Sequence, residues 1–228
     1  MGQELKIIGY IHTDFAEKFG IPRQSGIVPE LTATITFLPE YRQIEAFRGL
    51  ENFSHIWLLW SFDKVKRDNW CATVKPPKLG GNTRMGVFAT RSPYRPNSIG
   101  LSSVRLESIE YEKSTGPVLH VSGADLQDGT PIYDIKPYLS YTDCHTDATC
   151  GFIEQSKTDK LNIHFPKELL TLIPEEKRAA LQGVLAEDPR PGYQNDSERR
   201  YGIAFAGFDI RFTIDETELY VVEVVPLD

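Results

Sequence analysis

The sequence predicts a mainly β fold, in which a small antiparallel β-barrel over residues 1–150 is followed by an α+β annex over residues 151–228. In residues 31–37, apolar side chains alternate with threonines at a period of two, the pattern of a half-buried antiparallel strand. Further short apolar segments lie between Gly/Pro loops, which favours a closed or nearly closed barrel over a βαβ array. After about Gly151 the pattern becomes that of a helix followed by strands.

The predicted elements follow from these patterns in chain order. Barrel strands are expected at residues 5–12, 31–37, 54–62, 85–90, 101–110 and 118–122, with one or two helical turns at 41–47. Because residues 54–62 are rich in aromatics, we expect that strand to be fully buried. In the annex, Pro174, Glu175 and Glu176 suit the first turn of a helix over 174–186. Strands at 203–214 and 219–225 are expected to pair across a turn at Asp215 and Glu216.

Composition predicts a soluble, cytoplasmic protein. The chain has 228 residues and a net charge of −7, and no apolar run approaches the roughly 18 residues that a membrane span needs. The odd count of three cysteines suits reduced thiols in the cytosol. Cys144, His145 and Cys150 lack an evident fourth ligand, so no metal site is predicted.

The charge is unevenly distributed. Residues 64–95 contain eight basic side chains and one acid, Asp68, although the whole chain is acidic. Such a basic island predicts a local site for a polyanion. A solvated loop with a random charge bias is the alternative.

Residues 86–102, GVFATRSPYRPNSIGLS, carry the most specific motif. Pro93 and Pro96 restrict the backbone, so the donors Arg91, Arg95 and Asn97 lose less entropy on binding a ligand. Arginine suits carboxylate and phosphate groups, and Tyr94 is expected to be an exposed aromatic that stacks on a base. The alternative is a proline-stiffened hairpin whose arginines pair with surface acids. A doubly wound nucleotide-binding fold is not predicted, because the sequence lacks a glycine-rich turn between a strand and a helix. The dipeptide Gly80-Gly81 lies instead in a polar loop.

This motif resembles the signature of the TsaA-like, or TrmO, family of transfer-RNA methyltransferases. Further blocks at residues 22–26, 48–57 and 128–138, with shorter ones at 188–191 and 209–212, extend the resemblance over nearly the whole chain. The resemblance implies a non-Rossmann barrel that binds S-adenosyl-L-methionine, works as a homodimer and carries a C-terminal annex. It also implies methylation of N6 of threonylcarbamoyladenosine at position 37, next to the anticodon of a tRNA.

The resemblance also implies a set of cofactor contacts. These positions are Ser25, Gly26, Ile27, Asp63, Lys64, Arg91, Ser103, Ala124, Asp125, Leu126 and Gln127. Ser25, Asp63 and Lys64 differ from the side chains of other family members, so their contacts are expected to be mainly through the backbone.

Methyl transfer to this nitrogen needs a proton acceptor, because a nitrogen beside a carbonyl is a weak nucleophile until its proton is accepted or oriented. Asp134 and Tyr138 are the predicted candidates, in a proline-bounded loop where Lys136 could bind RNA phosphate or lower the pKa of the tyrosine. Asp128 and His55 are the second-choice candidates. Each has a structural alternative: Asp128 as a turn former, Tyr138 and His55 as core residues.

The remaining candidate residues are assigned to RNA. We expect the nucleotide and the cofactor carboxylate to be bound by Arg91, Arg95, Asn97 and Lys136. Arg91 is also a predicted catalytic residue, and Tyr94 is expected to stack on a loop base. Lys75 and Lys78, with the rest of the basic island, would hold the anticodon stem by its phosphates. Two rival functions remain: a noncatalytic RNA-binding barrel, and a hydrolase using the Asp128/Asp134 pair, which no metal cluster or nucleophile–base pattern supports.

Overall fold

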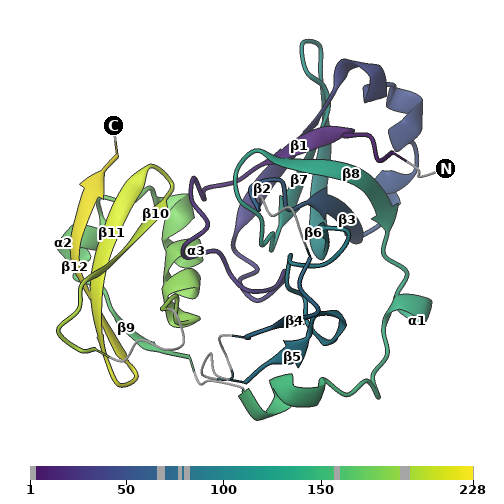
Figure 1. Cartoon of the computed structure of the whole chain (residues 1–228). Coiled ribbons are helices and arrows are strands. Elements are labelled where there is room, and N and C mark those ends of the chain that lie inside the picture. Colours follow the sequence, from purple (N-terminus) through teal and green to yellow (C-terminus); the bar gives the residue numbers. More distant parts are fainter. Residues whose placement is uncertain are drawn as a thin grey trace.

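The computed structural model shows two β-sheet bodies, a closed barrel and an annex, with helix α3 between the annex sheet and the barrel (Figure 1). It describes residues 4–65, 70–76, 79, 83–156, 160–190 and 196–227. The mainly β fold with a barrel and an α+β annex is therefore confirmed. In the described part of the chain, no helix is long and apolar enough to cross a membrane.

Six antiparallel strands close the barrel in the order β1-β2-β7-β6-β3-β8. Their bounds are β1 Gly9–His12, β2 Thr32–Phe37, β3 His55–Ser61, β6 Ile99–Glu112, β7 Gly116–Ser122 and β8 Thr130–Pro137. Inward side chains such as Ile35, Leu58 and Leu119 are fully buried and form the barrel core. The alternation predicted for 31–37 is confirmed in β2, because every second residue from Ala33 faces inward.

Three predictions about the barrel are wrong in detail. Strand β3 is not buried on both faces: Ile56, Leu58 and Trp60 point inward, whereas the residues between them are only half-buried. The strand expected over 85–90 ends after β5 (Met85–Gly86), which pairs with β4 (Thr73–Val74), and a 3₁₀ turn follows at Val87–Ala89. The segment predicted as a polar loop at 128–138 is mostly strand β8.

Short helical turns connect the barrel strands. Helical turns expected at 41–47 appear as 3₁₀ turns at Pro39–Tyr41 and Ile44–Phe47, followed by a third at Leu50–Asn52. After β8 come the single-turn helix α1 (Ser140–Asp143) and a 3₁₀ turn at Gly151–Ser156, which lead to the annex.

The annex is a four-stranded sheet in the order β10-β11-β12-β9, where β9 runs parallel to β12 and the other pairs are antiparallel. Its elements are β9 Asn162–His164, α2 Lys167–Leu170, α3 Glu175–Ala186, β10 Tyr201–Phe205, β11 Phe208–Asp215 and β12 Glu218–Pro226. The helix prediction is confirmed, with Pro174 as the N-cap. The single strand expected over 203–214 is two strands, because Ala206 and Gly207 adopt positive φ angles of 50° and 81° and make a tight hairpin.

The connection between β1 and β2 joins the two bodies. Phe15, Val28 and Leu31 leave the barrel and are buried in the annex core beside Leu181, Val184 and other residues of α3 and the annex sheet. Lys177 on α3 also pairs with Asp14 at 2.6 Å, and both side chains are largely buried. Residues 13–31 therefore depend on the annex for their position.

Candidate functional site

Two loops meet at one end of the barrel. The β1–β2 connection reaches the β7–β8 connection where the Gly26 N–H donates to the Gly123 carbonyl at 2.8 Å. The Ser103 N–H of β6 also donates to Ser25 Oγ at 3.2 Å. Ser103 is free for this contact because the pairing of β6 with β7 begins only at Arg105. Gly123 has a φ of 76°, and a Cβ there would lie 3.3 Å from the Gly26 backbone, so this close approach favours glycine. The fold thus brings Ser25, Gly26 and Ser103 next to the start of the segment 124–127.

A buried relay fixes the Asp125 carboxylate at this junction. Trp60 Nε1 donates to Ser102 Oγ at 3.0 Å, and Ser102 Oγ donates to Asp125 Oδ1 at 2.6 Å. The indole lies directly over Gly100, where a Cβ would fall 2.1 Å from the Trp60 ring. Gly100 therefore leaves room for the Trp60 indole, which orients the Ser102 hydroxyl, and Ser102 in turn orients Asp125. Neither Trp60 nor Ser102 was predicted as a site residue.

Asp125 is also the carboxyl group of the site with the most perturbed environment. Burial raises the pKa of Asp125 above its ordinary value, while the hydrogen bond from Ser102 and the positive charge of Arg91 oppose this shift. Arg91 is exposed, and its guanidinium donates to the side-chain oxygen of Gln24 on the β1–β2 connection. A carboxylate and a guanidinium therefore share one small region, which offers complementary charges to a ligand that carries both signs.

Most of the other predicted cofactor positions have side chains that are buried or already hydrogen-bonded within the protein. Ala124 and Leu126 are buried in the barrel core, and Ile27 packs against the annex core, so their side chains are occupied. Gln127 donates to the Ala16 carbonyl at 2.6 Å. Lys64, in the turn after β3, donates to the Asp128 carbonyl at 3.2 Å, and the neighbouring Asp63 is exposed.

Hydrogen bonds from Arg95 stabilise the motif loop, and the exposure of its aromatic residues differs from the prediction. Arg95 Nη1 donates to the Thr90 carbonyl at 2.9 Å and the Ser92 carbonyl at 3.4 Å, so this guanidinium braces the turn that carries Arg91. Asn97 is exposed. The expectation that Tyr94 is the exposed aromatic is wrong: Tyr94 is half-buried, whereas the side chain of Phe88 is exposed.

Comparison with known proteins shows the family of the chain. Residues 10–144 match the family profile of the tRNA-methyltransferase O N-terminal domain, and residues 158–227 match that of the TrmO C-terminal domain. This chain belongs to the TrmO family.

Relatives of the same family match over almost the full chain. The tRNA (adenine(37)-N6)-methyltransferase of Escherichia coli K12 is 39% identical over 230 residues, covering 96% of each chain. A putative S-adenosylmethionine-dependent methyltransferase of Pseudomonas aeruginosa is 40% identical, again over 96% of each chain. A crystal structure of TrmO from Pseudomonas aeruginosa superposes with a TM-score of 0.79 at 34% identity, covering 99% of this chain and 100% of that one.

The two main proton-acceptor candidates of this TrmO-family chain, Asp134 and Tyr138, lie apart from the cofactor positions, whereas Asp128 follows Gln127 and accepts a hydrogen bond from Lys64 at its carbonyl. Asp134 and Lys136 are on the outer face of β8, where Lys136 Nζ pairs with Asp134 Oδ2 at 3.0 Å. Strand β3 separates β8 from β6, and Trp57 of β3 is the register partner of both Lys136 and Ser103. Asp134 is thus on the same side of the barrel as Ser103 but two strands away.

Tyr138 does not have a lowered pKa, which was one of the two roles considered for Lys136. Its ring packs against Trp57 and His55, with centroids 5.5 and 6.1 Å away. Burial, with Cys144 and Asp143 nearby, raises the pKa of Tyr138, so a phenolate is disfavoured at neutral pH. The prediction about its pKa is therefore wrong, because Lys136 pairs with Asp134 and burial dominates at the phenol.

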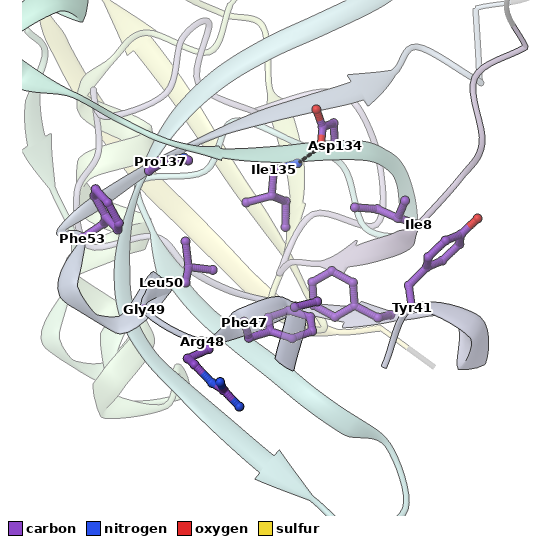
Figure 2. Close-up of a pocket in the computed structure, with 12 residues that line it drawn as sticks. Ile8, Tyr41, Phe47, Arg48, Gly49, Leu50, Phe53, Asp134, Ile135 and Pro137 are labelled. Atoms are coloured by element: carbon purple, nitrogen blue, oxygen red, sulfur yellow. Dashed lines mark hydrogen bonds between the residues drawn. The ribbon is translucent and has the colours of Figure 1, made fainter. Parts of the chain in front are cut away.

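An apolar groove of about 500 Å³ lies at the opposite end of the barrel (Figure 2). Phe47, Leu50 and Ile8 point into it, whereas the Asp134 carboxylate is directed to the other side of β8. The block at 48–57, which carries part of the family resemblance, contributes Arg48, Gly49, Leu50 and Phe53 to its wall. Among the predicted RNA contacts, Lys75 is exposed, and Lys78 lies outside the described residues.

Proposed function

We propose that this chain is an S-adenosyl-L-methionine-dependent tRNA methyltransferase that acts on N6 of adenosine 37, in its threonylcarbamoyl form, in the cytoplasm. The observation that carries the proposal is the meeting of Arg91, Asp125 and the loop 25–27 at one barrel end. The Escherichia coli relative bears this activity in its name. The barrel, residues 1–150, is the catalytic unit in this proposal, and the annex, residues 151–228, supports the loop at residues 25–27, called the cofactor loop below.

The site suits the proposed cofactor on chemical grounds. S-adenosyl-L-methionine supplies a methyl group from a sulfonium and carries an amino-acid end with both charges. Arg91 would bind its carboxylate, and Asp125 would attract its cationic part. Backbone groups at Ser25, Gly26, Ile27, Lys64 and Gln127 would bind the remaining polar atoms. Displacement at a methyl carbon is accelerated most by aligning the two reactants. The motif loop and the Trp60–Ser102–Asp125 hydrogen bonds would therefore increase the rate mainly by positioning them.

Asp134 is the proposed proton acceptor. Its carboxylate is fixed by the Lys136 ammonium and by the Ile135 N–H, at 3.0 and 2.9 Å, and it remains about half exposed to an incoming substrate. Tyr138 would act as a neutral phenol that donates a hydrogen bond, in keeping with its raised pKa. Lys75 and Lys78, with the other cations around residues 64–95, would bind the anticodon stem.

A homodimer is part of the proposal. Ile99 and Leu101 are 37% and 52% exposed on the outer face of β6, which offers an apolar strip to a second copy of the chain. Sedimentation equilibrium of the wild-type protein tests this directly, because a purely monomeric species would contradict it.

Arg91→Ala tests the proposed function. We expect methyl transfer to be lost, with cofactor affinity lowered at least about tenfold, because a charge-assisted contact contributes about 1.5–3 kcal/mol. Calorimetric titration with S-adenosyl-L-methionine and a methylation assay on tRNA would measure both effects.

The matched control for this variant is Arg105→Ala, since Arg105 is an exposed arginine on β6 that pairs only loosely with Glu107, at 3.4 Å. The thermal midpoint of both variants should match that of the wild type. An Arg91→Ala enzyme with full activity would contradict the assignment, and RNA binding by a wild-type chain that binds no cofactor would favour the noncatalytic alternative.

A further inference from the structure

An exposed aromatic pair lies beside the motif loop and has no role in the site described so far. Phe88 is 71% exposed and Trp70 is 51% exposed. Their rings are stacked, with centroids 6.2 Å apart and planes inclined by 24°. Large aromatic side chains that cluster in a solvent-exposed position on a protein surface are typical of a binding site.

The backbone around this pair is held firmly. Phe88 stands on the 3₁₀ turn Val87–Ala89, whose first residue, Val87, is 1% exposed and anchors the turn in the protein. The Val87 N–H donates to the Ala72 carbonyl at 3.0 Å, and the Cys71 N–H donates to the Tyr94 carbonyl at 3.1 Å. These bonds tie the segment that carries Trp70 to the motif loop, so the two rings are presented with little entropy left to lose.

The charge of the sequence that contains the pair favours a nucleic acid over a protein partner. Residues 70–106 contain six basic side chains and no acid. The Arg95 guanidinium lies 5.9 Å from the centre of the Phe88 ring, within the range of a cation–π contact. Exposed aromatics with arginine at their side are the usual means of holding unpaired bases, because every base offers a π-face for stacking.

The position of the pair indicates which base would bind. The Thr90 carbonyl, two residues from Phe88, accepts the hydrogen bond of Arg95, and the next residue is Arg91 of the proposed cofactor site. We propose that Phe88 and Trp70 form a stacking platform for an unpaired nucleobase that flanks the methylated adenosine in the anticodon loop. This inference rests on the proposed function and adds a substrate-binding surface to it.

The platform is tested with Phe88→Ala and Phe88→Tyr in the full-length protein, using an unmodified anticodon stem-loop as the probe. Phe88→Ala should weaken RNA binding by about tenfold to a hundredfold, the range measured when one stacking aromatic is removed. Phe88→Tyr should restore most of it, because the ring is kept. Tyr141→Ala, which removes an 85% exposed ring on α1, is the control and should bind RNA as the wild type does.

Three further readouts distinguish this platform from other roles of Phe88. The affinity of Phe88→Ala for S-adenosyl-L-methionine should equal that of the wild type. The loss of RNA affinity should persist at high salt, because stacking is not screened, whereas the contribution of Lys75 should fade. Trp70 emission should be quenched by RNA in the wild type, and Trp70→Phe should abolish that part of the signal.

Several results would overturn the platform. Unchanged RNA affinity in Phe88→Ala would do so, as would a loss of cofactor affinity, which would place Phe88 in the cofactor site. A change in the sedimenting mass of Phe88→Ala would instead identify the pair as a contact between two copies of the chain. A wild-type protein that binds cofactor but no stem-loop would overturn the platform alone, whereas one that binds neither would overturn the proposed function as well.

Discussion

The two ends of the barrel are built differently. At the end with the proposed cofactor site, the β1–β2 connection runs out to the annex, buries Phe15, Val28 and Leu31 there, and returns past Ser25 and Gly26. At the other end, three 3₁₀ turns close the barrel with its own residues around an apolar groove (Figure 2). The annex therefore supports the β1–β2 connection at the proposed cofactor site, and a change in the annex should reach that site but not the groove.

Asp125→Asn should cause the largest loss of cofactor affinity among the variants that test this difference between the two barrel ends. Asn can still accept the hydrogen bond from Ser102 but lacks the negative charge that we assign to cofactor binding. We expect the affinity for S-adenosyl-L-methionine to fall about tenfold to a hundredfold, since hydrogen bonds to charged groups contribute about 1.5–3 kcal/mol. Calorimetric titration measures this.

The same variant should lose cofactor affinity without losing thermal stability. Because burial raises the pKa of Asp125 in the folded state, its contribution to stability is fully present below the unfolded pKa and is lost as pH rises through the folded pKa. At neutral pH the burial of this carboxyl group therefore lowers stability, and Asp125→Asn should have an unchanged or higher thermal midpoint. A variant that is both less stable and fully competent for cofactor binding would contradict the assignment.

Gly183→Ala should give a smaller effect that starts in the annex. Gly183 lies inside α3, where alanine would normally gain about 1 kcal/mol of helix stability. Here the added Cβ would lie 2.7 Å from Cγ1 of Val28, two residues from Gly26, so Val28 must move. Overpacking of this kind costs about 1–3 kcal/mol, and we expect cofactor affinity to fall several-fold as the loop shifts.

Val28→Ala provides the matched background for this test, because it removes the methyl group that clashes. In that background, Gly183→Ala should have little effect on cofactor affinity, which a double-mutant cycle by calorimetry would show. Equal losses in both backgrounds would mean that α3 does not act on the loop through Val28.

Arg48→Ala should give the smallest effect. Arg48 is exposed at the groove end of the barrel, and the annex does not support the turns around it. We expect unchanged affinity for S-adenosyl-L-methionine and a stability within about 0.5 kcal/mol of the wild type, as for most surface substitutions. A clear loss of cofactor affinity would show that the two barrel ends are coupled, against the comparison above.

Local patterns predicted much of the fold. The alternation in β2 and the proline and glutamates that start α3 are short-range signals, and both elements form where they were expected. Strand β8 was missed because Pro131 and Pro137 suggest a loop, yet they lie at the second and the last position of the strand, where a missing N–H is tolerated.

The site was only partly predictable, because its main contacts are long-range. The motif drew attention to Arg91, but its partner Gln24 is 67 residues away, and Ser102 joins Trp60, 42 residues before it, to Asp125, 23 residues after it. Which side of a strand faces the core depends on register, and no local signal distinguishes Ser102 as the inward serine and Ser103 as the outward one before the barrel closes.

The central claim is tested most directly by incubating the wild-type protein with S-adenosyl-L-methionine and a tRNA that carries threonylcarbamoyladenosine, and then analysing the nucleosides by mass spectrometry. We predict that the threonylcarbamoyladenosine at position 37 gains the mass of one methylene group, and that fragmentation places the added methyl on the base at N6. An unchanged nucleoside in the presence of bound cofactor, or a methyl group at another position, would contradict the account.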